Sequence, residues 1–234
     1  MRYMGSKNRI AKHTLPIMLE HAEKQNLTTW VEPFVGGGNM IDKVPDYFRR
    51  KGYDLNPHVI MALRDIRDRA ESLPEECSEE YYKSLRGTEA ASITSWLRFV
   101  CAFGGDFEHG FAKDSVGGNY AAIGKRNALK QSPKLQGVSL GNKCYSKIRV
   151  ANAVVYCDPP YQNTSGYKTG AFDHEAFFDW CRVMANDNLV FVSEYNAPND
   201  FIELWAGECL TNFASNRKTA THRAVEKLFL VPKG

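Results

Sequence analysis

The sequence predicts an α/β protein with a doubly wound, mostly parallel, Rossmann-like sheet and an inserted segment of helices and loops. Three observations predict this fold. Short apolar runs alternate with helical patterns, a glycine-rich loop follows the first apolar run, and the next strand pattern ends in an acid about 20 residues later. The 234 residues suffice for one such domain with an insertion.

The composition is that of an ordinary soluble globular protein, with 43% hydrophobic and 24% charged residues. No apolar run approaches the roughly 20 residues that span a bilayer, and the polar, basic N-terminus lacks a signal-peptide core. We therefore expect a cytoplasmic protein without a membrane partner, and a monomer in solution.

The six cysteines are widely spaced without a C-x-x-C pair, which favours reduced thiols and predicts no metal site.

The first third of the chain reads as helix, strand and glycine loop. Apolar residues recur at helical spacing from Asn8 to about Lys24, and Thr28 to Glu32 reads as a short strand. The loop Pro33 to Met40 contains three consecutive glycines, which let backbone N–H groups approach a ligand, and a helix is expected from about Asn39. The loop is neither a P-loop nor a complete G-x-G-x-x-G site, so alone it is weak evidence.

Asp54 ends the second strand pattern, which begins at Lys51. A carboxylate at this place binds ribose hydroxyls in doubly wound folds. The alternative is an N-cap or Asx-turn ahead of the helix expected from His58 to Arg69. The spacing from the glycine loop favours the ligand.

The segment 73–149 differs in character and is predicted to be an inserted target-recognition domain, with residues 1–72 and 150–234 forming the main domain. It contains helical patterns at about 75–85 and 89–103, then a glycine-rich, basic stretch with interspersed aromatics. Basic and aromatic residues on loops suit phosphate contact and base stacking. A lid over a small-molecule site is the alternative.

Charge is unevenly placed, although the net charge is only +3. No acid lies between Asp114 and Asp158, and the two ends of the chain are also rich in lysine and arginine. Three basic windows indicate one face that meets a polyanion, against the alternative of ordinary solvated charge. The candidates for contact with nucleic acid are Lys113, Lys125, Arg126, Lys130, Arg217 and Lys218.

The segment Cys157 to Tyr161 follows an apolar run, 153–156, that reads as a buried strand. Pro159 and Pro160 lack N–H groups and fix their own φ, so the strand must end in a stiff loop. Such a loop holds the Asp158 carboxylate, two proline carbonyls and the Tyr161 ring rigidly, which suits a flat base with an exocyclic amine. A plain strand end with a turn is the alternative.

The remainder of the chain continues the alternation. Asp173 is the expected N-cap of a helix, and 189–193 reads as another buried strand. A helix is expected near 200–205, followed by terminal strands at about 209–213 and 225–231. These last strands predict an antiparallel edge.

Four signatures stand in order along the chain: Tyr3 to Lys7, Val31 to Gly38, Asp54, and Asp158 to Tyr161. In this order the chain resembles the Dam-type DNA adenine-N6 methyltransferases, of the D12 class and alpha group. The resemblance is thin from about 73 to 149. It implies a Rossmann-like sheet that binds S-adenosylmethionine (SAM) and a double-stranded DNA substrate.

The resemblance also implies residue roles. SAM would be held by Tyr3, Lys7, Glu32, Pro33, Phe34, Gly36, Gly38 and Asp54, and the target adenine by Asp158, Pro159, Pro160 and Tyr161. The chain departs from the family at 103–113, where the arginine-rich pattern of GATC-reading loops is missing. This departure predicts a shorter or more relaxed recognition site.

The chemistry of the residues agrees. If the Asp158 carboxylate and the Pro159 carbonyl each accept an N–H of the amine, its nitrogen can pyramidalise and direct its lone pair to the methyl group. Asp158 is the candidate to receive the released proton. The alternatives are methylation of RNA, methylation of cytosine N4, and a non-catalytic nucleic-acid-binding protein. In the family, aspartate rather than serine before Pro-Pro-Tyr favours adenine over cytosine N4.

Overall fold

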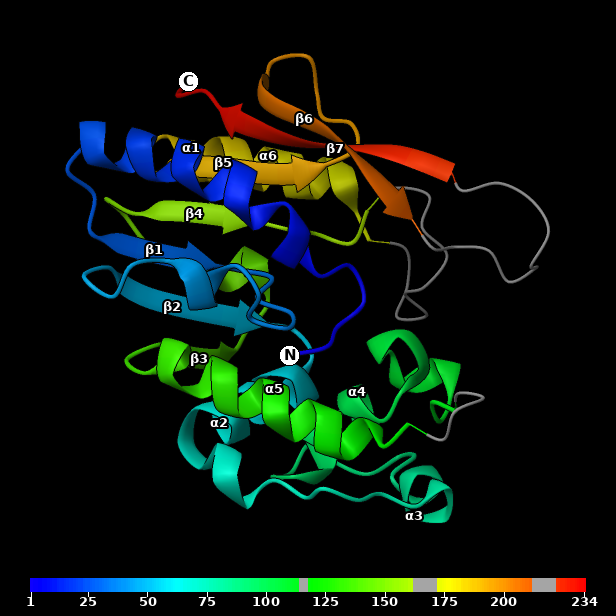
Figure 1. Cartoon of the computed structure of the whole chain (residues 1–234). Coiled ribbons are helices and arrows are strands. Elements are labelled where there is room, and N and C mark those ends of the chain that lie inside the picture. The colour runs from blue at the N-terminus through cyan, green and yellow to red at the C-terminus, as the bar shows by residue number, and fades with distance from the viewer. Residues whose placement is uncertain (114–117, 162–171, 212–221) are drawn as a thin grey trace. The chain divides into compact units, whose positions relative to one another are not determined.

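The computed structural model describes residues 1–113, 118–161, 172–211 and 222–234 (Figure 1). The predicted contacts Arg217 and Lys218 lie outside these residues. The described strands form a seven-stranded sheet in the order β3-β2-β1-β4-β5-β7-β6. The pairs β2–β3, β1–β4 and β4–β5 are parallel, whereas β7 is antiparallel to β5 and β6. The predicted mostly parallel α/β sheet with an antiparallel edge is confirmed.

Backbone contacts divide the chain into two compact units. The first unit consists of Met1–Ala11 and Phe34–Tyr145, and the second of Lys12–Pro33 and Ser146–Gly234. The predicted division into a main domain and an insertion at 73–149 stays a prediction.

The first unit is mainly helical around a two-stranded parallel ribbon. Its strands are β2 (Arg49–Asp54) and β3 (Ser139–Asn142), and its helices are α2 (Pro57–Arg69), α3 (Glu79–Ser84), α4 (Thr94–Val100) and α5 (Tyr120–Leu135). Short 3₁₀ turns lie at Lys7–Arg9, Ile41–Lys43, Ala70–Ser72, Phe103–Gly105 and Phe107–His109, and another, Tyr145–Lys147, lies at the boundary between the units. Helix α2 begins where Asn56 caps the His58 N–H and Pro57 fits the first turn. Its buried side chains include Leu63 and Ile66, both fully buried.

Helix α5 is the largest departure from the prediction, which placed glycine-rich basic loops in this range. The 16-residue helix is capped by Asn119, whose side chain accepts the Ala122 N–H at 3.0 Å. Gly124 and Pro133 lie inside the helix. Both residues have low helix propensity, so the sequence does not predict a helix there. Lys125, Arg126 and Lys130 therefore stand on a helix. The helix expected from Asn39 is also wrong, because only the turn Ile41–Lys43 forms there.

The second unit holds the five remaining strands. Its elements are α1 (Ala11–Lys24, whose first residue belongs to the first unit), β1 (Thr29–Glu32), β4 (Val154–Cys157), α6 (His174–Ala185), β5 (Leu189–Glu194), β6 (Ile202–Thr211) and β7 (His222–Val231). Strands β4 and β5 are buried along their whole length, as expected for central strands. Helix α1 covers one face, where the His21 and Phe191 rings meet edge to face at 5.9 Å. The thiols of Cys157 and Cys181 interact on the other face, beneath α6.

The helix expected at 200–205 is wrong, because Ile202 begins β6 instead. Strand β6 pairs along its length with β7, with an irregularity between Glu203 and Trp205. The local sequence does not distinguish helix from strand at 202–205. Pairing with β7 favours the strand, because it satisfies the hydrogen-bonding groups of the β6 backbone. No helix among the described residues is long and apolar enough to cross a membrane.

Candidate active site

The second unit contains the point where the strand order reverses. In the order β3-β2-β1-β4-β5, the strand numbers fall as far as β1 and rise from β4. The reversal therefore lies between β1 and β4. These strands are parallel, with Trp30 opposite Val154 and Val31 opposite Val155. Glu32 ends β1, and Asp158 directly follows β4. Both carboxyl groups therefore lie at the carboxyl edge of the switch point, where open α/β sheets bind ligands.

Glu32 is held in a fixed position at this edge. Its side chain is 2% exposed, and its Oε1 accepts a hydrogen bond from the Trp30 indole Nε1 at 2.9 Å. The Trp30 ring packs against Tyr156 of β4, with 6.3 Å between ring centroids. A carboxyl group that is buried and bonded in this way presents a preorganised acceptor.

The loop from Asp158 to Tyr161 is anchored at two points. The Pro160 carbonyl oxygen lies 2.9 Å from Nε2 of His174, at the start of α6. The Tyr161 hydroxyl donates to Oε1 of Glu226 on β7 at 2.5 Å, and its ring meets the Tyr195 ring edge to face at 4.6 Å. The stiffness predicted from two consecutive prolines is thus reinforced by contacts from α6, from β7 and from Tyr195, the residue after β5.

Two tyrosine hydroxyls near Asp158 remain protonated donors. Burial, with the carboxyl group of Asp158 as the next cause, raises the pKa of Tyr156 and of Tyr161 well above its usual value. The Tyr156 hydroxyl lies 2.8 Å from Oγ of Ser193 on the neighbouring strand β5. The surroundings of Asp158 therefore offer hydroxyl groups and no thiolate, because burial also raises the pKa of Cys157.

The glycine loop and Asp54 lie together in the first unit. The Gly36 N–H donates to Oδ2 of Asp54 at 3.0 Å, and the Val35 N–H donates to the Tyr53 carbonyl at 2.8 Å. Oδ1 of Asp54 accepts the Asn56 N–H at 2.9 Å. Asp54 therefore forms an Asx-turn, which was the alternative expected from the sequence. It also contacts the glycine loop, whose spacing from Asp54 favoured the interpretation as a ligand-binding residue.

Burial raises the pKa of the Asp54 carboxyl to about 6, although the N–H groups of Asn56 and Gly36 lower it. A carboxyl group with this pKa changes charge close to neutral pH. Perturbed carboxyls of this kind concentrate at functional sites.

The N-terminal segment packs directly on the glycine loop. Gly36 has φ +47°, and an added Cβ would lie 3.0 Å from the Tyr3 ring. Only glycine fits this position without strain. Lys7 is 8% exposed, and its Nζ donates to the Gly5 carbonyl at 3.0 Å.

The other predicted cofactor residues lie as follows. Gly38 also has positive φ, and a Cβ there would meet Leu63 at 3.0 Å. The Phe34 ring is 5.4 Å from that of Tyr145, both in the first unit. Pro33, in the second unit, is buried directly after Glu32.

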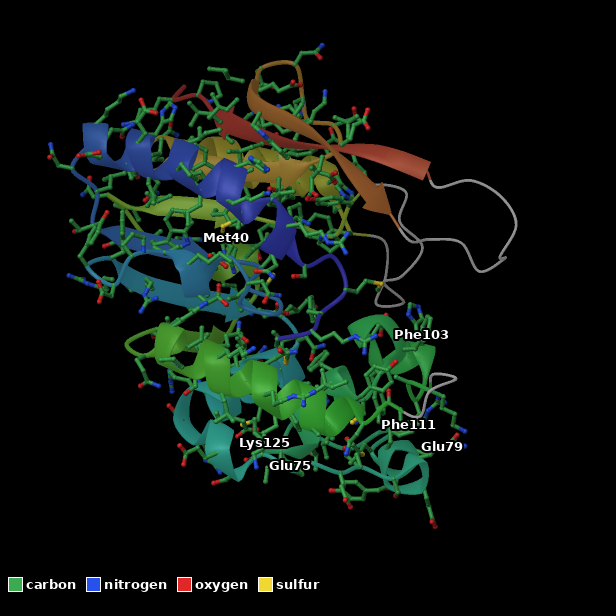
Figure 2. The ribbon with its side chains drawn as sticks, viewed as in Figure 1. Met40, Glu75, Glu79, Phe103, Phe111 and Lys125 are labelled. Carbon is green, nitrogen blue, oxygen red and sulfur yellow. The ribbon has the colours of Figure 1, made fainter. Side chains whose placement is uncertain are left out.

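The predicted DNA contacts in the first unit differ in their surroundings. Lys113 forms an ion pair with Glu79 at 2.5 Å, and Lys125 forms one with Glu75 at 3.0 Å (Figure 2). Arg126 and Lys130 are exposed on α5, one turn apart. The Lys113 side chain is 66% exposed and that of Lys125 only 19%, so the weak energy of an exposed ion pair applies to Lys113.

The aromatics expected to stack on bases are largely occupied inside the first unit. Phe107 is buried against Tyr82 and beneath the Arg98 guanidinium, and Phe111 also contacts Tyr82. Phe103 was not singled out from the sequence, yet its side chain is 62% exposed (Figure 2). The turn Phe103–Gly105 that carries it is closed by the Phe103 N–H, which donates to the Gly110 carbonyl at 2.9 Å.

Sequence reasoning also missed His174 and Glu226, the two side chains that anchor the loop after β4. His174 lies 14 residues after Pro160 and Glu226 lies 65 residues after Tyr161, so no local pattern marks either contact. Among the described residues, no group of three His, Cys, Asp or Glu side chains could hold a metal ion. No disulfide joins the five cysteines whose side chains are described.

No protein-family model and no curated protein sequence matches the chain. Solved structures similar to it include Escherichia coli yhhF, a candidate methyltransferase, with 9% identity over 95% of this chain and 86% of that one, at a TM-score of 0.39. Another is the N-methyltransferase NodS from Bradyrhizobium japonicum WM9, with 8% identity over 97% and 99% of the two chains, at 0.42. A third is SMU.472, a candidate methyltransferase in complex with SAH, with 9% identity over 60% and 46%, at 0.25.

Proposed function

We propose that the chain transfers a methyl group from SAM to the N6 amine of adenine in double-stranded DNA. The observation that supports this most is a pair of carboxyl groups at the switch point: Glu32 ends β1, and Asp158 directly follows the adjacent parallel strand β4. The Pro-Pro-Tyr sequence after Asp158 supplies what an amine-bearing base needs: a carboxylate, a carbonyl and a ring on one stiff loop.

The residues assigned to SAM fit a nucleoside cofactor. At Gly36 the Tyr3 ring takes the place of a side chain, which holds Tyr3 against the loop, and Asp54 offers a carboxylate to ribose hydroxyls at the end of β2. Bound SAM supplies an electrophilic methyl group. Glu32, Tyr3 and Lys7 are the further residues that we assign to its binding.

The reaction itself is assigned to the loop after β4. The Asp158 carboxylate and the Pro159 carbonyl accept the two N–H groups of the amine, which localises the nitrogen lone pair and directs it toward the methyl group. The Pro160 carbonyl already faces His174, so Pro159 is the proline left for the amine. Asp158 then receives the released proton or passes it to water.

The target adenine must leave the helix, because its amine is inaccessible within the base stack. Tyr161 is the side chain that we assign to stacking on the extruded base, worth about 1–3 kcal/mol. Its hydroxyl bond to Glu226 fixes the ring orientation before the base arrives. Exposed Phe103, Arg126 and Lys130 are the proposed contacts with the duplex, and the missing arginines at 103–113 favour relaxed sequence specificity.

One experiment separates this function from the alternatives. The protein is incubated with methyl-labelled SAM and either unmethylated duplex DNA or RNA, and the products are digested to nucleosides. The proposal predicts label in N6-methyldeoxyadenosine. Label in N4-methyldeoxycytidine or in RNA nucleosides would overturn it, as would DNA binding without any transfer, which would indicate a non-catalytic binding protein.

A further inference from the structure

His174 presents both of its ring nitrogens to carbonyl oxygens. Nδ1 lies 3.0 Å from the carbonyl oxygen of Phe172, and Nε2 lies 2.9 Å from that of Pro160. A carbonyl oxygen only accepts hydrogen bonds, and a neutral imidazole has one N–H to donate. Either nitrogen can therefore donate to the carbonyl oxygen that it faces, and Nε2–H is the donor that reaches the loop after β4.

A buried carboxyl group lies beside the same ring nitrogen. Oε1 of Glu194, at the end of β5, lies 3.6 Å from Nε2 of His174, and the Glu194 side chain is fully buried. Its Oε2 accepts the Tyr195 N–H at 2.6 Å. Nε2 of His174 is thus enclosed between the Pro160 carbonyl and a carboxyl group that is itself fixed by a backbone N–H.

The ring itself is placed by α6. Asp173 caps the helix by accepting the Ala176 N–H at 3.0 Å, which fixes the backbone of His174. The Phe172 ring meets the imidazole edge to face at 4.9 Å. The histidine is thus held from its own helix, while its Nε2 reaches the loop after β4.

We propose that His174 is a positioning residue for the loop that holds the adenine amine. This inference rests on the proposed function. The Nε2–H of His174 donates to the Pro160 carbonyl, and the restraint keeps the Pro159 carbonyl and Asp158 in the geometry that the amine requires.

Two substitutions of nearly equal size test the role. The amide nitrogen of His174→Gln can replace Nε2 and donate to Pro160, whereas the shorter amide of His174→Asn replaces Nδ1 and reaches only Phe172. We expect kcat/KM for DNA to fall by roughly 10- to 100-fold in His174→Asn and by only a few fold in His174→Gln, with SAM affinity unchanged in both. A merely structural role would instead make the activity of the two variants follow their melting temperatures. Equal activities in wild type and His174→Asn would overturn the inference.

The hydrogen bond is tested without any activity measurement. Nitrogen NMR of the full-length protein should show a proton on Nε2 of His174, the nitrogen that faces the Pro160 carbonyl oxygen. A spectrum in which only Nδ1 carries a proton would contradict the inference. Because the proposed function is tested by labelled nucleosides in the wild type, its failure is distinguishable from failure of the role of His174.

Discussion

At the scale of single residues, Asp158 carries the largest expected effect. Asp158→Ala removes the acceptor of one amine N–H and of the released proton. We therefore expect the rate of methyl transfer to fall by about 10²–10⁴-fold. The assigned SAM residues are other side chains, so SAM affinity should stay close to that of the wild type. Single-turnover transfer and calorimetric SAM titration measure the two quantities. Lost SAM binding, or a rate within tenfold of the wild type, would contradict the assignment.

Asp54 predicts how SAM binding depends on pH. Its pKa is raised to about 6, so its carboxylate form, to which we assign the ribose hydroxyls, is depleted below that pH. The dissociation constant for SAM should rise by up to about tenfold per pH unit as the pH falls below about 6. Titrations between pH 5 and 8 test this, with Asp54→Asn as the control that should bind weakly and lack the dependence. An identical pH dependence in both proteins would exclude Asp54 as its cause.

The same residue affects folding with a definite sign. The native pKa of about 6 exceeds the usual 3.8, so the native state retains a proton that the unfolded chain has lost between these values. This contribution to the free energy of unfolding therefore falls as the pH rises from about 4 to about 6.

At the scale of elements, helix α5 shows what the sequence could not predict. Gly124 lowers the local helix propensity, yet its missing side chain allows close packing on α4, where an added Cβ would overlap Val100 and lie 3.1 Å from Trp96. The helix forms because tertiary packing outweighs propensity. By contrast, Asp173 and the apolar run of β4 were predictable, since a cap and a fully buried central strand leave local signals.

This packing yields a stability prediction. Gly124→Ala should lower the melting temperature, because overpacking costs about 1–3 kcal/mol and exceeds the gain of about 1 kcal/mol in helix propensity. Asn127→Ala, at an exposed position of the same helix, is the control and should not lower it. Thermal unfolding followed by circular dichroism measures both. A more stable Gly124→Ala protein would show that α4 and α5 pack less closely than described.

The turn that carries Phe103 yields a prediction about DNA binding. Phe103→Ala removes an exposed ring able to contact bases, so the dissociation constant for duplex DNA should rise by about 5- to 150-fold, corresponding to about 1–3 kcal/mol of stacking. SAM affinity and melting temperature should change little. Tyr47→Ala removes a ring that is 69% exposed elsewhere in the first unit and serves as the control. Equal DNA affinity in the wild type and Phe103→Ala would exclude the ring from the interface.

At the scale of the whole molecule, the order of signatures could be predicted from the sequence and the order of strands could not. Glu32 and Asp158 are each recognisable as the end of an apolar run. Their place at the two strands beside the switch point follows from long-range pairing of β1 with β4. The same limit explains why His174 and Glu226, which anchor the loop from α6 and β7, escaped prediction while the loop itself did not.

The central claim is that Asp158 and the loop after it hold an adenine amine of DNA for methyl transfer. Its most direct test is mass spectrometry of nucleosides from the DNA of a methylation-deficient host that expresses the protein. We predict N6-methyldeoxyadenosine with the wild-type chain and none above background with Asp158→Ala at equal protein level. The claim would be contradicted by soluble, SAM-binding wild-type protein whose host DNA contains no N6-methyldeoxyadenosine.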